Sequence, residues 1–245
     1  MVPPGDIGAL PIWVGVYLAL ILVSAVSGYV FYQRVLSLIR QGKGVARFDR
    51  PLVRLGGALV IVLGQSRVLQ RIRFGDWAGL GHAIIFWGFL SFSLSYAIFI
   101  FGGSIWRSFP EKLLTSTGVR VYSSYLEITA ALLLVMLAWA LVRRWVVKPH
   151  RLSFDLTRNL DSVIVVGLIA GLMVSTILTH AFYVAQGGEG PESEVIIGGV
   201  LGDWFTDLGV GTGLANTLQG VFWWTHLAII LGFAVYIPFS KHMHM

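Results

Sequence analysis

The chain has 245 residues, of which 56% are hydrophobic and only 12% charged, and its mean hydropathy is +0.77. This balance is far from that of a soluble domain and is typical of an integral membrane protein. The net charge is +6, and we expect no nucleic-acid partner. There are no cysteines, so the chain alone can form neither a disulfide nor a thiolate-ligated iron–sulfur cluster. Any such cluster must belong to a partner.

Five stretches are long and apolar enough to cross a bilayer. They cover residues 12–36, 78–101, 125–147, 160–185 and 218–239. A sixth apolar run is too short to span and is bracketed by arginines, which predicts a helix on the membrane surface within residues 51–73. No internal repeat or long linker divides the chain. We therefore expect one all-α membrane domain over residues 1–245, a bundle of five transmembrane helices.

Basic residues predict the orientation of this bundle. Residues 34–73 carry nine Lys or Arg and residues 143–158 carry five, whereas the second-to-third connection carries three. Residues 186–217 carry none and hold five acidic side chains. The positive-inside rule then places the N-terminus outside and Lys241 at the cytoplasmic face. No basic residue precedes the first span, so we expect a mature helix there rather than a signal peptide.

Two histidines on the last apolar segment share one helix face. His226 and His244 are 18 residues apart, which is five whole turns and about 27 Å along a helix. That distance is close to the thickness of the hydrocarbon core. The spacing predicts two metal centres, one near each membrane surface.

Two further histidines match these two depths. His82 opens the second span at the inner level of His244, and His180 ends the fourth span at the outer level of His226. Two lone imidazoles per level, without cysteine or a matching carboxylate, suit two b haems better than zinc or copper. A single histidine of this kind is more often a packed or interfacial side chain, but two depth-matched pairs favour ligands. His242 is the weaker alternative to His244.

The last helix resembles that of the nitrate reductase gamma subunit family. The matching residues are Trp-Thr-His-Leu at 224–227 and Pro-Phe-Ser-Lys-His-Met-His at 238–244. The resemblance implies two b haems on histidines at this spacing, with His82 as the partner in the cytoplasm-proximal haem. That family's distal partner lies ten residues further along the second helix, where this chain has Phe92. His180 is our substitute for it.

The Ser-Lys-His-Met-His ending, the Trp-Trp-Thr-His run and the Thr-His-Ala of the fourth span look closer to one branch of proteins. They resemble the membrane region of heterodisulfide-reductase-like proteins, including electron-transfer-flavoprotein:menaquinone oxidoreductases. The resemblance implies a cysteine-rich iron–sulfur domain or subunit on the cytoplasmic side. It also implies menaquinone, an electron-transfer flavoprotein as a further partner, and the cytoplasmic membrane of a prokaryote. The chain is either docked through its C-terminus or part of something longer.

Polar residues at the outer end are candidates for quinone chemistry. Glu127 lies just inside the third span with Tyr125 beside it, and it could exchange a proton with a quinone near the outer haem. Arg120 could hydrogen-bond a quinone carbonyl. An interfacial carboxylate in water and an anchoring arginine explain these residues equally well.

The sequence thus predicts a di-haem membrane cytochrome b that exchanges electrons between an iron–sulfur partner and the quinone pool. The direction of electron flow is not readable from the sequence. One alternative is a haem-free proton or ion transporter that uses His180, Glu127 and His82, although mid-membrane carboxylates and broken helices are lacking. Another is a structural anchor for a soluble redox subunit.

Overall fold

The computed structural model describes residues 3–5, 11–42, 49–70, 72, 77–147 and 156–239, the side chains of 156–159 excepted. Within these ranges the secondary structure is helical. Five helices are long and apolar enough to cross a membrane, which confirms the all-α, five-span prediction. These spans are Ile12–Gln41, Ala78–Ile105, Phe109–Val147, Leu160–Ala185 and Thr212–Phe239.

Several spans are built from more than one helical element. In chain order, the elements are α1 (Ile12–Phe31), η1 (Tyr32–Leu36), α2 (Ser37–Gln41), α3 (Pro51–Val62), α4 (Ser66–Leu69), α5 (Ala78–Ser95), η2 (Tyr96–Gly102), α6 (Gly103–Ile105), α7 (Phe109–Val142), η3 (Arg143–Val147), α8 (Leu156–Ala185), α9 (Ile196–Asp207), α10 (Thr212–Tyr236) and η4 (Ile237–Phe239). The turns η1, η2 and η3 are π-helical, so three of the spans widen locally without being interrupted.

The third helix is longer than its apolar stretch. It begins at Phe109 rather than at residue 125, and it kinks at Thr115, where φ is 64° and ψ is 163°. Its first part is polar and rich in Ser, Thr and Gly, which hides it from a hydropathy-based prediction. The connection before the last span also contains a helix that the sequence analysis did not predict, α9.

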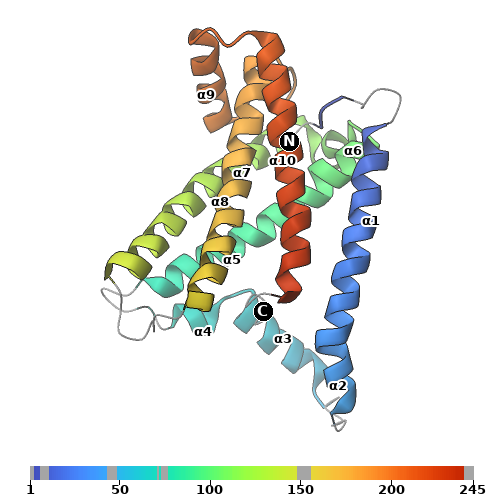
Figure 1. The fold of residues 1–245 in the computed structure, drawn as a ribbon, viewed down its shortest axis with the longest axis vertical. Helices are drawn as coiled ribbons and strands as arrows, with labels where there is room; N and C mark the ends of the chain where they lie inside the picture. The colour runs from blue at the N-terminus through green and yellow to red at the C-terminus, as the bar shows by residue number, and fades with distance from the viewer. Residues whose placement is uncertain are drawn as a thin grey trace.

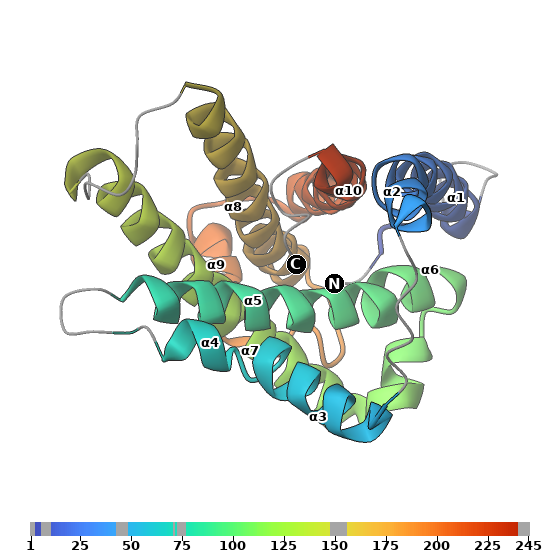
Figure 2. The same cartoon turned by 90° about the horizontal axis from the view of Figure 1, so that it is seen from below.

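The helices pack as a tilted bundle. Helix α8 contacts α10, α9 and α7, while α5 packs on α7 and α1 packs on α10 (Figure 1). Figure 1 places α9 at one end of the bundle and α2, α3 and α4 at the other. Seen from below, α5 crosses the bundle with α8 and α10 on one side and α3 and α4 on the other (Figure 2). The described part of the basic connection between the first two spans therefore lies at one end, opposite the acidic connection that contains α9.

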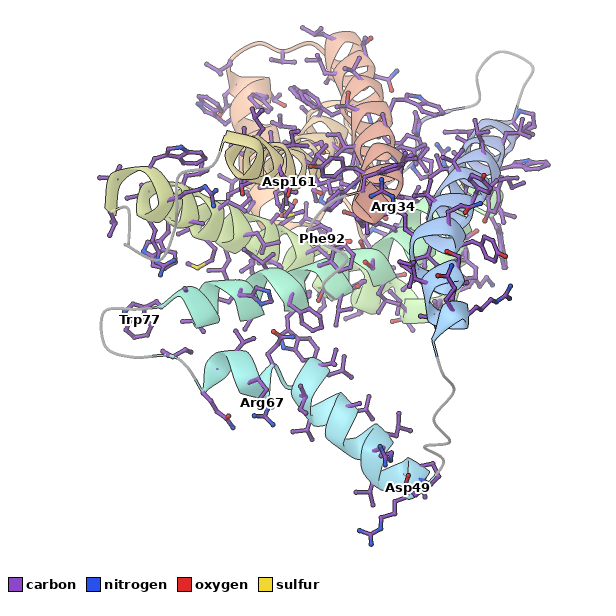
Figure 3. All side chains as sticks on the ribbon, turned by 60° about the horizontal axis from the view of Figure 1, so that its bottom comes forward. Arg34, Asp49, Arg67, Trp77, Phe92 and Asp161 are labelled. Atoms are coloured by element: carbon purple, nitrogen blue, oxygen red, sulfur yellow. The ribbon has the colours of Figure 1, made fainter. Side chains whose placement is uncertain are left out.

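The predicted surface segment contains the helix α3. Every side chain of α3 is exposed. Among the described elements, α3 packs closely only on α4. Figure 3 shows α3 and α4 below α5, with Asp49 before α3 and Arg67 on α4. Arg54 pairs with Asp49 at 2.7 Å. A helix in this region is confirmed, and its location at the membrane surface stays a prediction.

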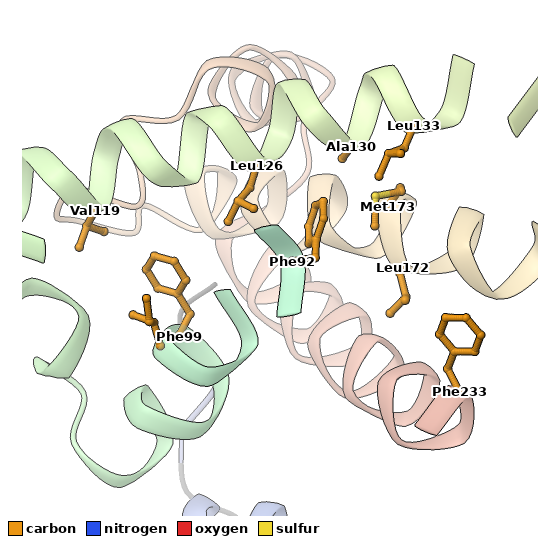
Figure 4. Close-up of a cluster of buried hydrophobic side chains, with 10 residues drawn as sticks. Phe92, Phe99, Val119, Leu126, Ala130, Leu133, Leu172, Met173 and Phe233 are labelled. Atoms are coloured by element: carbon orange, nitrogen blue, oxygen red, sulfur yellow. The ribbon is translucent and has the colours of Figure 1, made fainter. Parts of the chain in front are cut away.

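The apolar core lies between α5, α7, α8 and α10. Figure 4 shows its buried side chains, which come from these helices and from η2. They include Phe92, Phe99, Val119, Leu126, Ala130, Leu133, Leu172, Met173 and Phe233. In a membrane, close packing of this kind supplies much of the helix association, because lipid is as apolar as the core. Most of α1 is exposed, and Ser27 Oγ donates to the Ala234 carbonyl of α10 at 3.0 Å.

Helix α9 is held against α8 by two glycines four residues apart. A Cβ at Gly202 would lie 2.6 Å from Val184 Cβ and 2.7 Å from the Ala181 carbonyl oxygen. A Cβ at Gly198 would lie 2.7 Å from His180 Cβ. Glycine is therefore required at both positions for this approach, as in other small-residue helix contacts. The packing brings the N-terminus of α9 next to α7 and α8.

Candidate functional site

A buried carboxylate and a buried histidine form a pair between α7 and α8. His180 Nδ1 lies 2.8 Å from Glu127 Oε1, and the two side chains are 2% and 0% exposed. Burying a charged or polar group is costly unless it is hydrogen-bonded, so each partner stabilises the other in this position. The alternative of an interfacial carboxylate in water is wrong, because Glu127 has no exposed surface.

The N-terminus of α9 supplies further donors to the same carboxylate. Glu127 Oε2 accepts the backbone N–H of Ile197 at 2.7 Å. The N–H of Gly198 reaches both carboxylate oxygens at 3.1 Å. The first N–H groups of a helix have no partner within the helix and favour an acceptor of negative charge. Because backbone N–H groups can only donate, Glu127 is an acceptor here and favours the His180 tautomer that carries its proton on Nδ1.

The second buried histidine is fixed in a similar way from α8. His226 on α10 has no exposed surface, and its Nδ1 lies 2.8 Å from Ser175 Oγ. The Ser175 hydroxyl donates to the Gly171 carbonyl at 2.6 Å. A hydroxyl has one proton, so Ser175 Oγ accepts from His226 Nδ1–H and the lone pair of His226 stays on Nε2. The ring of Tyr96 packs edge-on against His226, with centroids 5.4 Å apart.

Both imidazoles direct an unpartnered nitrogen into the protein. Among the described residues, the buried polar atoms without a hydrogen-bond partner include Tyr96 Oη, Ser123 Oγ, Thr179 Oγ1, Trp223 Nε1, His180 Nε2 and His226 Nε2. Leaving such an atom unpaired costs about 1–3 kcal/mol. A histidine whose Nδ1 is held by a carboxylate or hydroxyl and whose Nε2 is available has the arrangement of a metal ligand. The Nε2 atoms of His180 and His226 therefore fit a haem iron as ligands.

The two histidines lie in the same half of the α8–α10 pair, with an offset. His226 contacts Ser175, and His180 is five residues further along α8. Five residues correspond to about 7 Å along a helix. The void that His180 lines with Phe92 and Tyr96 measures about 10 Å³. A porphyrin between the histidines thus requires these neighbouring side chains to change rotamer, so the donors fit the group and the local volume does not.

An apolar cavity adjoins the other predicted centre. It measures about 390 Å³ and lies between α5, α7, α8 and α10, with His82 at one end and Phe92 in its wall. This volume falls in the usual range of cofactor and ligand sites. The lining is apolar apart from His82, Ser93 and Tyr96, which suits a porphyrin. His244, the predicted second ligand, and its alternative His242 lie outside the described residues.

The three residues predicted for quinone chemistry are not gathered at one place. Arg120 forms an exposed ion pair with Glu194 at 2.9 Å. Tyr125 is 46% exposed, and its hydroxyl lies 2.9 Å from Ser91 Oγ on α5. Of the predicted outer residues, the structure brings together only Glu127 and His180.

A pocket at the end of the bundle that carries α9 was not visible in the sequence. It measures about 260 Å³ and is lined by residues of the α6–α7 region and of the connection before α9. Phe99 and Val119 line it together with Arg107, Tyr183 and Glu192. Phe99 also lines the small void beside His180. Phe99 is therefore a wall shared by the pocket and the void beside His180.

No group of three or more His, Cys, Asp or Glu side chains that could hold a metal ion occurs in the described part of the chain. A haem iron takes only one or two ligands from the protein, so a haem site needs no such group.

Comparison with known proteins gives one informative match. No family model matches this chain, and no solved structure does. Over 233 residues the chain is 30% identical to FadF of Bacillus subtilis (strain 168), described as a probable iron–sulfur-binding oxidoreductase. The match covers 93% of this chain but 31% of that protein, so the chain spans about a third of its relative's length. The resemblance to nitrate reductase gamma subunits stays a prediction. Similarity to an oxidoreductase and five membrane-length helices together fit an electron-transfer membrane subunit.

Proposed function

We propose that this chain is a di-haem membrane cytochrome b that passes electrons between an iron–sulfur component and the quinone pool. The observation that carries the proposal is the pair of buried histidines, His180 and His226. Each has its Nδ1 held by a neighbouring acceptor and its Nε2 without a hydrogen-bond partner. Most buried side-chain nitrogens in proteins have a hydrogen-bond partner, so two histidines that each leave Nε2 unpaired favour ligands over packing.

The proposed ligands are His180 and His226 for the outer haem and His82 and His244 for the inner one. Support for the inner centre comes from the 390 Å³ apolar cavity beside His82. A bound b haem supplies reversible one-electron transfer. The chain's own contribution is to orient the imidazoles, to exclude water and to set the surrounding charge. A reduced-minus-oxidised visible spectrum of the purified protein tests the proposal, and a spectrum without b-type bands would favour a transporter or an anchor.

The proposed electron partner is a cytoplasmic, cysteine-rich iron–sulfur subunit or domain. The relative is described as iron–sulfur-binding, whereas this chain has no cysteine. Most of the relative's length lies outside the matched region and could hold such clusters. An electron-transfer flavoprotein as a further partner, menaquinone as the acceptor and a prokaryotic cytoplasmic membrane follow from the family resemblance.

Filling the cavity beside His82 tests the inner centre. Ala234 lines this cavity, and its replacement by phenylalanine adds volume without adding charge. We expect Ala234→Phe to lower the haem content by about one haem per chain, because a porphyrin and the new ring compete for the same 390 Å³. Pyridine haemochrome analysis of purified protein measures this. Val174→Phe is the control, because Val174 is exposed on α8. Full haem content in Ala234→Phe would contradict the assignment.

We propose that quinone binds at the outer end, near His180. Of the predicted residues, Glu127 is buried and could exchange a proton only through its contacts, while Tyr125 and Arg120 could meet a quinone at the exposed surface. The 260 Å³ pocket supports a second arrangement, in which the ring rests on Phe99 and Val119 near Arg107 and Glu192. Such a pocket offers an apolar bed with a few polar groups, as quinone recognition needs.

Two variants distinguish these quinone arrangements. If quinone uses the pocket, Glu192→Gln should slow quinone-dependent oxidation of the reduced protein by about tenfold or more, as expected for loss of a proton-transfer group. Tyr125→Phe should then leave the rate unchanged. Stopped-flow measurement with a menaquinone analogue gives both rates, and the visible spectra verify intact haems. If Tyr125→Phe slows quinone-dependent oxidation and Glu192→Gln does not, the quinone binds at the exposed Tyr125 surface.

A further inference from the structure

The first turn of helix α9 makes polar contacts in addition to its packing on α8. It lies in a connection with acidic residues and is too short to cross a membrane, yet its first turn donates two N–H groups to a residue 70 positions earlier. That residue, Glu127, also holds Nδ1 of His180. The three elements α7, α8 and α9 therefore meet at one carboxylate.

We propose that Glu127 is the positioning residue of His180, and that the first turn of α9 holds Glu127 in place for this task. Glu127 fixes the Nδ1–H tautomer and the ring orientation, so that Nε2 points into the protein as a ligand atom. The ligand role itself rests on the proposed function. When one ring nitrogen of a histidine binds a metal, a carboxylate that accepts the N–H of the other ring nitrogen raises the basicity of the histidine. It also adds negative charge near the metal. The outer loop thus sets the electronic properties of the outer centre.

The geometry explains why both oxygens of Glu127 are needed. One oxygen receives His180 Nδ1–H at 2.8 Å, and the other receives Ile197 N–H at 2.7 Å. A glutamine has one carbonyl oxygen and an NH₂ group that cannot accept. Glu127→Gln would therefore set a donor against either the helix N-terminus or the histidine. It also removes the negative charge without changing the size of the side chain.

Two neighbouring glycines give a matched pair for the role of α9. A Cβ at Gly198 would lie 2.6 Å from Glu127 Oε1 and 2.7 Å from His180 Cβ, so an alanine there must push the helix away from the pair. A Cβ at Gly199 meets nothing within 4 Å. Gly198→Ala and Gly199→Ala make the same chemical change in the same helical turn. Only Gly198→Ala disturbs the contact of α9 with Glu127 and His180.

The test uses the purified protein in detergent, reduced with dithionite so that any low-spin haem is diamagnetic. Histidine ¹⁵N NMR reports the His180 tautomer, with the signal assigned from its loss in His180→Gln. A redox titration followed in the visible spectrum reports the midpoint potential of the outer haem. We expect Glu127→Gln and Gly198→Ala to shift the His180 signal away from the pure Nδ1–H form. Glu127→Gln should also raise the potential, because less negative charge then faces the oxidised iron.

Gly199→Ala should match the wild type in both measurements. Glu127→Asp keeps the charge and should restore much of the potential, which a purely structural role would not require. The proposal is overturned if haem is present and Glu127→Gln leaves both the potential and the His180 signal unchanged, or if Gly198→Ala behaves as Gly199→Ala does. If the protein holds no haem but the His180 signal shifts in Glu127→Gln, the positioning role stands and the proposed function fails.

Discussion

Replacing His226 by leucine should remove the outer haem and leave the inner one. His226 is completely buried on α10, and its Nε2 has no hydrogen-bond partner, so a leucine of similar size fills the same place without a ligand atom. The haem content measured by pyridine haemochrome analysis should fall from about two haems per chain to about one, as expected for the loss of an axial ligand. His180→Leu should give the same result, because both imidazoles are proposed to serve one iron.

Two comparisons make this result decisive. His150 follows Lys148 and Pro149 in a basic connection and is not among the predicted ligands, so His150→Gln is the control and should keep both haems. His82→Leu should instead remove the inner haem. If wild-type protein contains a single haem and His226→Leu leaves its spectrum unchanged, the outer centre does not exist, and the phenylalanine at position 92 explains its loss.

The helices that span the membrane could be predicted from sequence because long apolar runs depend on local composition alone. The second and fourth spans begin or end within a few residues of their predicted limits. Helix α9 could not be found in this way, since it has 12 residues and is too short for a span. The polar first part of α7 was missed for a related reason, because hydropathy detects lipid contact and not helix formation.

The candidate site shows the same division. Depth along the helices predicted His180 and His226 in the same half of the bundle. In the structure His226 lies beside Ser175, which is five residues, or about 7 Å, from His180 along α8. Sequence spacing could not pair Glu127 with His180 and Ile197, because these contacts join residues 53 and 70 positions apart. The glycines that permit the contact, Gly198 and Gly202, form a recognisable small-residue pattern on α9. A search for that pattern in the acidic connection could have predicted helix α9 and its close packing on another helix.

Reversing the charge of the basic end should weaken electron transfer with the iron–sulfur component. Arg40 and Arg67 are exposed at the end that carries α2 and α4 (Figure 1), opposite α9. The double variant Arg40→Glu with Arg67→Glu should slow partner-dependent haem reduction at low ionic strength by about tenfold or more, because complementary charge speeds encounter. The rates of variant and wild type should converge as salt is added, since exposed charges are screened beyond about 10 Å at 0.1 M salt.

The control reverses one charge at the other end. Lys112 is exposed in the first part of α7, on the outer side of the predicted topology. If the partner docks at the basic end, Lys112→Glu should leave the reduction rate and its salt dependence unchanged. If Lys112→Glu slows partner-dependent haem reduction and the double variant does not, the partner docks on the side of α9. The positive-inside orientation and the proposed cytoplasmic partner would then fail together, because the same basic residues carry both.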